Sequence, residues 1–531
     1  MAVRTDYDAV VIGAGFSGMY LLKTLRENGL RVRVFDRAHD VGGTWYWNRY
    51  PGARCDVESL YYSYSFSEEL QQEWRWTERY AAQPEILDYA RHVADRFDLR
   101  RDISLGTEVR SAAFDPAGDR WLVRAGGAEV AARFLIAAVG CLSTTSMPDY
   151  PGLADFRGEA HHTGDWPDEP VEFTGKRVAV VGTGSSGIQT ITAIAGEPEH
   201  LTVFQRTPNF SVPARNRPLD DEEQRQVKAG YARLRETLRR SFSGLPTERL
   251  ERNALEVPRE EFQAALDRNW RRGGLGFPGV FQDTLADPAA NELSAEYVRE
   301  RIREVVDDPR TAELLCPRDF PLGTKRLCVD TGYYEVFNRD DVELVDVRER
   351  PIERITPSGI RQGGRDFELD VIVFATGFDA MTGALNRIDI RGADGRLLRE
   401  EWAEGPRTYL GLASAGFPNL FLVTGPGSPS VLSNMMVSIE QHVEWIAGHL
   451  RYLRDRGLTR SEADAEAQRR WDEHVAEVAS LTLFPRAASW YAGANVPGKP
   501  RLFMPYVGGV GTYREICDAV AADGYRGFVL S

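Results

Sequence analysis

Apolar runs near the start of the chain meet glycine-rich turns in the order strand, turn, helix. Residues 8–13 predict a buried strand, 16–28 predict a helix that Gly29 ends, and 31–36 predict a second strand. The same order returns later in the chain, at 177–182, from about 186, and at 201–205. Two βαβ units are therefore expected, each of the kind that covers a parallel sheet with helices.

The middle of the chain changes to charge-rich sequence with apolar residues at helical spacing. This pattern runs from about 219 to 310, and Ser294 is expected to cap a helix within it. Strand-like runs return at 342–345 and 369–374, and a late helix with one apolar face is expected to end at Gly457. The residues that carry the helical spacing are Val227, Tyr231, Leu234, Leu238, Val298, Ile302 and Val305.

Composition narrows the class of protein. The chain is 42% hydrophobic and 27% charged, as in ordinary globular proteins, and its formal net charge of −14 disfavours a general binder of nucleic acid or anionic membranes. No run of about 20 apolar residues and no signal-like segment is present, so neither a membrane span nor export is expected. Five cysteines without a C-x-x-C pair favour a reducing cytoplasm, and no metal site is expected.

The first glycine loop follows the first predicted strand and opens the first helix. Its glycines, Gly13, Gly15 and Gly18, allow a tight turn, close approach of the backbone to a pyrophosphate and close packing of the helix. The helix N-terminus would face the anion. Asp36 ends the second strand, where an acidic side chain commonly binds a ribose hydroxyl. A surface carboxylate at a strand end is the alternative interpretation of Asp36.

The second glycine loop has the same setting but a different residue after its second strand. Arg206 and Thr207 stand there, where an acid would repel a 2′-phosphate and an arginine can bind it with a fork of hydrogen bonds. The first loop is therefore assigned to FAD and the second to NADPH or NADP+, with a solvated surface arginine as the alternative for Arg206. The loop residues expected at the second dinucleotide are Gly182, Gly184, Ser185 and Gly187.

These patterns predict an α/β chain with two Rossmann-like dinucleotide-binding domains and a helical insertion. The FAD-binding domain is expected to be discontinuous and to comprise 1–143 and 379–531. The NADP-binding domain is expected to comprise 144–213 and 324–378, with the helical insertion at 214–323. Because no redox cysteine pair is present, electrons would pass to O2 or a quinone rather than to a disulfide.

A fingerprint joins the two predicted domains. Phe156, Gly158, His162 and Trp166 follow the spacing F-x-G-x-x-x-H-x-x-x-W, which resembles the fingerprint of the Baeyer–Villiger monooxygenases at every fixed position. Related monooxygenases that oxidise nitrogen or sulfur commonly end this motif with another aromatic residue, so Trp166 favours the ketone-oxidising branch. Three further stretches are more similar to phenylacetone monooxygenase and its relatives than to the cyclohexanone enzymes, namely 205–208, 425–434 and 490–499.

The resemblance implies a catalytic pair and a reaction. Arg326 is similar to the family's active-site arginine, and Asp56 would be its charge partner, with an ordinary ion pair as the alternative. In the family, FAD reduced by NADPH reacts with O2, and the resulting C4a-peroxyflavin converts a ketone to an ester or lactone, with sulfoxidation as a side activity. A guanidinium that stays charged can hold both the peroxide and the developing oxyanion.

The resemblance also implies roles for residues around the cofactors and the substrate. Lys325 would turn toward the 2′-phosphate with Arg206, and His162 would lie in the interdomain linker with a conformational role rather than one in proton transfer. Thr44 and Trp45, in an early family motif, would contact cofactor. The residues implied to cover or shape the cofactor and substrate region are Trp490, on a mobile loop, and Ser430, Val431 and Leu432.

Two rival functions share parts of this pattern. A monooxygenase for sulfides or amines would carry both glycine loops, but it needs no arginine opposite a carbonyl. A non-catalytic redox sensor would bind both dinucleotides, and the Arg326 and Asp56 pair argues against it. The expected partners are a small ketone and O2, the expected state is a monomer or weak oligomer, and the sequence does not name the ketone.

Overall fold

The computed structural model describes residues 6–246 and 250–531, and both predicted βαβ units are present. The first consists of β1 (Tyr7–Ile12), α1 (Phe16–Glu27) and β2 (Val32–Phe35). The second consists of β8 (Arg177–Val181), α5 (Ser185–Ile194) and β9 (His200–Gln205). Every predicted limit lies within one residue of the observed one, because glycines and the ends of apolar runs mark these limits in the sequence.

The first sheet combines early and late parts of the chain. Its strand order is β17-β4-β5-β6-β1-β2-β3, and β18 pairs with β6. Around β1 the strands are parallel, so that Val11 lies between Val34 of β2 and Ile136 of β6. The other strands of this sheet are β3 (Ile103–Ser104), β4 (Val109–Asp115), β5 (Arg120–Ala125), β6 (Ala128–Ala137), β17 (Asp389–Arg391) and β18 (Leu420–Leu422).

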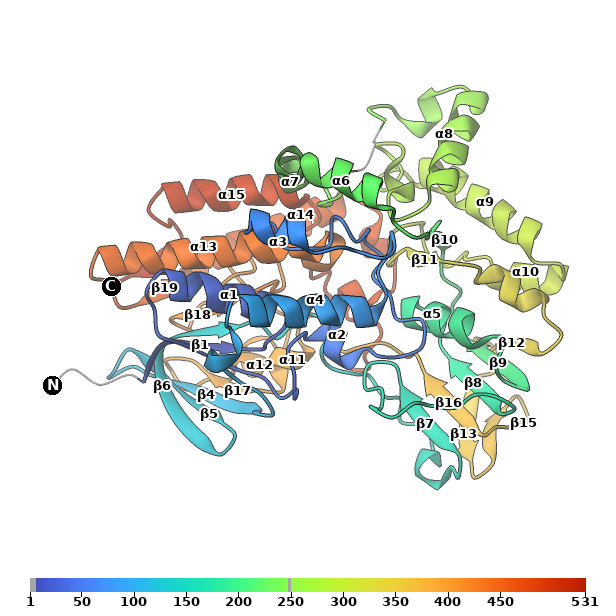
Figure 1. Cartoon of the computed structure of the whole chain (residues 1–531), viewed down its shortest axis with the longest axis horizontal. Coiled ribbons are helices and arrows are strands. Elements are labelled where there is room, and N and C mark those ends of the chain that lie inside the picture. Colours follow the sequence, from blue (N-terminus) through green and yellow to red (C-terminus); the bar gives the residue numbers. More distant parts are fainter. Residues whose placement is uncertain (1–5, 247–249) are drawn as a thin grey trace.

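The second sheet is parallel throughout, in the order β12-β9-β8-β16-β7. Its added strands are β7 (Glu159–His162), β12 (Val342–Asp346) and β16 (Val371–Phe374). A small antiparallel sheet lies next to it, formed by β13 (Ile352–Thr356), β14 (Gly359–Gln362) and β15 (Arg365–Glu368). Figure 1 shows the two main sheets in separate halves of the molecule, with the second at the lower right.

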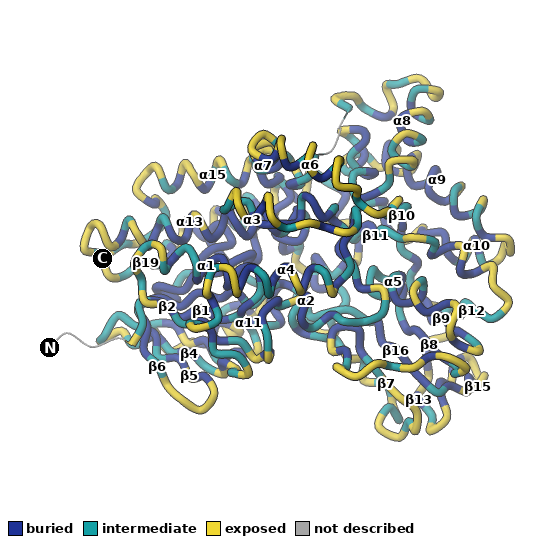
Figure 2. The backbone as a smooth tube through the Cα atoms, viewed as in Figure 1, coloured by how far each residue is buried: buried dark blue, intermediate teal, exposed yellow. Residues whose placement is uncertain are grey.

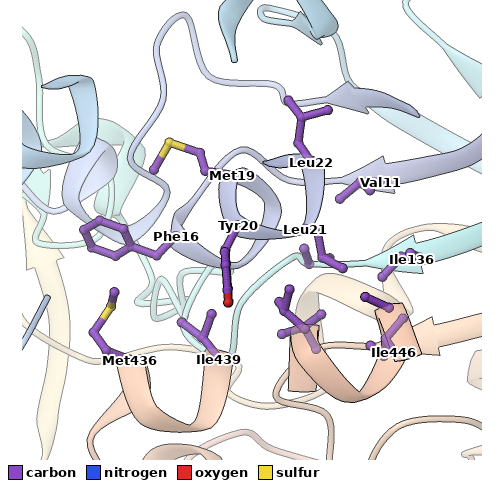
Figure 3. Close-up of a cluster of buried hydrophobic side chains, with 14 of the residues drawn as sticks. Val11, Phe16, Met19, Tyr20, Leu21, Leu22, Ile136, Met436, Ile439 and Ile446 are labelled. Carbon is purple, nitrogen blue, oxygen red and sulfur yellow. The ribbon is translucent and has the colours of Figure 1, made fainter. Parts of the chain in front are cut away.

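Helices from both ends of the chain pack together on the first sheet. Figure 3 shows apolar side chains of α1, including Phe16 and Leu21, facing Met436, Ile439 and Ile446 of the long helix α13. These side chains are buried, and Figure 2 shows the buried chain running through both halves. The helices of this half are α2 (Thr44–Trp47), α3 (Glu68–Glu73), α4 (Gln83–Arg96), α11 (Gly383–Asn386), α12 (Leu398–Glu401), α13 (Met435–Asp455), α14 (Ala465–Ser480) and α15 (Val510–Ala522).

The predicted insertion is helical, but its helices contact both halves of the molecule. Buried Lys228 and Arg235 donate hydrogen bonds to main-chain carbonyls of the first half, at Gln72, Trp74 and Tyr61. The later helices share a hydrophobic core with the second sheet. The helices are α6 (Asp221–Ala229), α7 (Tyr231–Arg240), α8 (Arg259–Arg272), α9 (Pro288–Val305) and α10 (Pro309–Leu315). Short strands complete the fold at β10 (Ser211–Pro213), β11 (Cys328–Asp330), β19 (Ser461–Ala463) and β20 (Phe528–Leu530).

The predicted N-cap at Ser294 is wrong. The helix begins six residues earlier, at Pro288, and Ser294 lies buried within it. Asp287 is the actual N-cap, and its side chain accepts hydrogen bonds from the backbone of Ala289 and Ala290. An aspartate followed by proline at the first helical position is the stronger start signal. In the described part of the chain, no helix is long and apolar enough to cross a membrane.

Candidate cofactor and catalytic site

A large cavity lies where the two nucleotide-type units meet. Its volume is about 1640 Å³, above the roughly 300–1,000 Å³ typical of a single small-ligand site. Both glycine loops border it, at the carboxyl ends of β1 and β8, where open α/β sheets bind ligands. The predicted site residues that line it are Gly13, Gly15, Asp36, Thr44, Trp45, Asp56, Gly182, Gly184, Ser185, Arg206, Thr207, Lys325, Arg326, Val431 and Trp490.

The first loop presents an uncapped helix end to this cavity. Gly15 is the N-cap of α1, no side chain accepts a hydrogen bond from that first turn, and the turn contains no acidic residue. Free N–H groups at a helix N-terminus suit an anion such as a pyrophosphate. Gly18 does not line the cavity, and a Cβ there would lie 1.8 Å from the Gly13 carbonyl oxygen. Gly18 therefore allows the helix to pack tightly against the turn.

Asp36 holds the first loop in shape. Its Oδ2 accepts a hydrogen bond from the Ala14 backbone N–H at 2.6 Å, and its Oδ1 accepts one from Ala38 at 2.8 Å. Burial raises the pKa of Asp36, and these two N–H groups oppose that effect. The carboxylate also lines the cavity, so a ribose hydroxyl could still bind its remaining lone pairs.

The second loop offers an open cradle. Gly184 caps α5 without a side-chain hydrogen bond, and the nearest atom to a Cβ built on it is Asn209 Nδ2 at 3.9 Å. The space beside Gly184 is therefore free for a ligand. Gly187 is packed instead, since a Cβ there would lie 2.1 Å from the Gly182 carbonyl oxygen. This cradle and the two uncapped helix ends fit two dinucleotides.

Arg206 and Lys325 bring two positive charges to one end of the cavity. Burial lowers the pKa of Lys325, and the neighbouring Arg206 lowers it further. The Lys325 Nζ lies 4.4 Å from the centre of the Phe320 ring. Two neighbouring cations repel one another, and an anion bound between them stabilises the charged form of both. A 2′-phosphate would be such an anion. Thr207, which follows Arg206, also lines the cavity, and its carbonyl accepts a hydrogen bond from Thr183 Oγ1 at 3.0 Å.

Arg326 and Asp56 meet in a two-point contact. Arg326 Nε donates to Asp56 Oδ2 at 2.8 Å, and Nη2 donates to Oδ1 at 2.6 Å. Burial alone would lower the pKa of Arg326, but the facing carboxylate raises it above the ordinary arginine value. A third bond runs from Nη1 to the Val431 carbonyl oxygen at 3.0 Å. The guanidinium is thus permanently charged and anchored at three nitrogens in the cavity wall.

Of the predicted substrate-pocket residues, only Val431 lines the cavity. Ser430 is fully buried behind the wall, and Leu432 packs into a neighbouring apolar cluster. The Val431 carbonyl, which binds Arg326, was not predicted, because a backbone acceptor has no sequence signal. Cys141, which lines the cavity and contacts Ser430, was not predicted either.

The fingerprint lies outside the cavity lining. His162 is the buried last residue of the edge strand β7, inside the second sheet rather than in a free linker. Its Nδ1 accepts a hydrogen bond from the Gly164 N–H at 3.0 Å, and its Nε2 lies 3.3 Å from Thr376 Oγ1, which donates to the Ser146 carbonyl. Burial lowers the pKa of His162. The ring therefore ties together the two segments that pass between the halves.

The other fingerprint residues pack. A Cβ on Gly158 would lie 2.3 Å from the Asp370 carbonyl oxygen, and Phe156 joins the core of the second sheet. Trp166 is buried, and its carbonyl accepts a hydrogen bond from Arg49, the second residue after α2. Arg49 also forms an ion pair with Asp168. The fingerprint thus contacts the segment that follows the predicted cofactor residues of α2.

Trp490 lies in a short 3₁₀ turn (Trp490–Ala492) at the cavity. Its ring centre is 4.2 Å from that of the buried Tyr491, and Gly493 follows with φ +69°. A residue with positive φ ends the turn sharply, which favours glycine. Trp490 is therefore held from one side by Tyr491 and bordered on the other by the cavity.

The known proteins to which this chain is similar are monooxygenases. Residues 7–212 match the family described as "Flavin-binding monooxygenase-like". The chain is 45% identical to an acetone monooxygenase (methyl acetate-forming) of Gordonia sp. (strain TY-5), over 99% of both chains. An oxidized steroid monooxygenase structure bound to NADP is 53% identical over 99% of both chains, with a TM-score of 0.95. A cyclohexanone monooxygenase structure from Rhodococcus sp. Phi1, bound to NADP+, is 45% identical over both whole chains, with a TM-score of 0.97.

Proposed function

The chain belongs to the flavin-binding monooxygenases of the Baeyer–Villiger type, and from this premise we propose that it uses NADPH and O2 to convert ketones to esters or lactones. The observation that carries the proposal is the Arg326 guanidinium, fixed by Asp56 in the wall of a cavity that both glycine loops share. The proposed partners are a small ketone and O2, and the proposed state is a monomer or weak oligomer.

Arg326 provides the positive charge that this chemistry needs. Three of its five N–H groups bind Asp56 and Val431. The other two are shared between Tyr491, which also hydrogen-bonds Arg326, and a ligand in the cavity. A fixed donor stabilises an oxygen atom that becomes negative as the carbonyl is attacked, without the cost of reorganising water. Asp56 keeps the guanidinium oriented, because a carboxylate matches its planar fork.

Other residues of the chain would bind the two cofactors. Bound FAD would accept two electrons from NADPH and supply the reaction with O2. The uncapped end of α1 would hold the FAD pyrophosphate, with Asp36 at its ribose and Thr44 and Trp45 beside it. The uncapped end of α5 would hold the NADPH pyrophosphate.

Two further groups would complete the site. Arg206 and Lys325 would bind the 2′-phosphate, with Thr207 beside them. Trp490 would cover the cavity and exclude water from it, because its ring lies in the cavity wall. Val431 would contact the ketone.

The test is reduction of the enzyme by NADPH without oxygen, followed by aeration with cyclic, linear and aryl ketones and mass spectrometry of the products. A gain of one oxygen atom as an ester or lactone is expected. Rapid NADPH consumption with only hydrogen peroxide as product across the whole panel would contradict the ketone assignment. Oxidation of sulfides alone would assign the site to oxygenation of soft nucleophiles.

A further inference from the structure

The loop 424–433 contains two residues with left-handed backbone that are not glycine. Thr424 has φ +57° and Ser430 has φ +34°. A Cβ makes this region unfavourable, so such residues persist only where surrounding contacts hold them. Both side chains are buried, at 3% and 0% exposure, which means that protein contacts rather than solvent hold the loop.

Cys141 contacts both of these residues, which are also joined directly by a bond from Ser430 Oγ to the Thr424 carbonyl at 3.4 Å. Its Sγ lies 3.0 Å from Ser430 Oγ and donates to the Thr424 carbonyl at 3.2 Å. From the other side, the Thr424 N–H donates to His442 Nδ1 at 2.8 Å. Burial lowers the pKa of His442 to about 3, so the ring is neutral and can accept this bond. The loop is thus held between α13 and the segment that carries Cys141.

The held loop presents a carbonyl to Arg326. Ser430 begins the 3₁₀ turn Ser430–Leu432, and the Ser433 N–H and hydroxyl both donate to the Ser430 carbonyl, at 3.0 and 2.8 Å. Val431 is therefore fixed in the middle of the turn, where its carbonyl accepts from Arg326 Nη1. Asp56 binds only Nε and Nη2, so the Val431 carbonyl adds an anchor at Nη1, beside the hydrogen bond between Arg326 and Tyr491.

We propose that Cys141 and Ser430 are positioning residues, which fix the Arg326 guanidinium through the Val431 carbonyl. Ser430 acts from behind the cavity wall and does not contact the ketone, since its side chain is fully buried. Loss of the thiol or of the hydroxyl frees the strained turn, the carbonyl leaves Nη1, and the guanidinium can tilt about the Asp56 contact. The kinetic consequence rests on the proposed function.

The kinetic test compares Cys141→Ala and Ser430→Ala with Cys141→Ser, which keeps a hydrogen-bond donor. Cys517→Ser is the matched control, because Cys517 is also a buried cysteine but lies on α15 outside the cavity lining. In both alanine variants, ester formed per NADPH consumed should fall by at least about tenfold, the lower end of the effect of losing a hydrogen bond to a charged group. Anaerobic flavin reduction and the KM for ketone should stay unchanged, and both serine variants should resemble the wild type.

A rise in KM that grows with ketone size, at unchanged ester yield, would overturn the proposal by making these residues part of the substrate wall. Crystal structures of the wild-type and variant holoenzymes supply a measurement independent of turnover. The Arg326 Nη1 to Val431 oxygen contact should be present in the wild type and lost in both alanine variants. Retention of that contact in both would overturn the proposal. Its loss in a protein whose wild type forms no ester would support the positioning role and refute the proposed function.

Discussion

Replacing Arg326 tests the central feature of the site. Arg326→Ala removes two hydrogen bonds to Asp56, one to Val431 and the contact with Tyr491, together with the donor that remains for a ligand. Loss of a fixed donor that stabilises a developing oxyanion typically costs about 10²- to 10³-fold in kcat. Ester formation should fall by at least this factor. FAD content and anaerobic reduction by NADPH should stay near wild type, because the glycine loops are untouched.

The structural cost of this change should be modest. Removing one partner of a fully buried ion pair destabilises a protein by about 3–5 kcal/mol. The Arg326 and Asp56 side chains are 24% and 23% exposed toward the cavity, so water can reach the carboxylate that remains. We therefore expect a loss of about 1–2 kcal/mol in the free energy of unfolding.

Two lysine variants separate charge from geometry. Arg326→Lys keeps the positive charge but cannot contact both carboxylate oxygens and Val431 at once, so it should also lose ester formation. Arg217 also forms a two-point contact on the surface, through Nη1 and Nη2 to Glu223 at 2.6 and 2.7 Å, and Arg217→Lys should leave activity unchanged. The assays are stopped-flow reduction and mass spectrometry of the product. Normal ester formation by Arg326→Ala would refute the assigned role, and full activity of Arg326→Lys would refute the need for the fork.

Four further substitutions test the cofactor ends and the pH response. Arg206→Ala and Lys325→Ala should each erode the preference for NADPH over NADH by about 1.5–3 kcal/mol, measured as the ratio of kcat/KM values, and an unchanged ratio in both would move the phosphate site elsewhere. Gly184→Ala should fold normally, because the nearest atom to its Cβ is Asn209 Nδ2 at 3.9 Å, an ordinary contact, but it should raise the KM for NADPH. Gly196→Ala, whose Cβ has no atom within 4 Å, should change neither. A normal KM for Gly184→Ala would contradict pyrophosphate binding there. Burial raises the pKa of Asp472 to about 7, above its unfolded value, so stability is lost as pH rises through about 7. Asp472→Asn should therefore reduce the fall in apparent melting temperature between about pH 5 and about pH 8, and an equal fall in both proteins would contradict the shifted pKa.

The sequence determined the two nucleotide-type units almost completely. Their signals are local, since each glycine loop, strand end and helix start lies within about 35 residues, and hydrophobic periodicity specifies such elements directly. The contrast between Asp36 and Arg206 is equally local, and the prediction that the first loop binds FAD and the second binds NADP rests on it. The wrong N-cap prediction at Ser294 has a local cause as well. Serine is a common N-cap residue, but Asp287 followed by Pro288 is the stronger helix-start signal.

Only the tertiary structure decided how the site is assembled. Asp56 and Arg326 are 270 residues apart in the chain, and family resemblance, rather than periodicity or spacing, pointed to their contact. The bond from Arg326 to Val431 involves a backbone carbonyl, whose direction depends on the turn that begins at Ser430. The role of Cys141 likewise depends on packing between distant segments. Such contacts form only when the fold brings separate loops to one cavity, and residue type alone does not encode them.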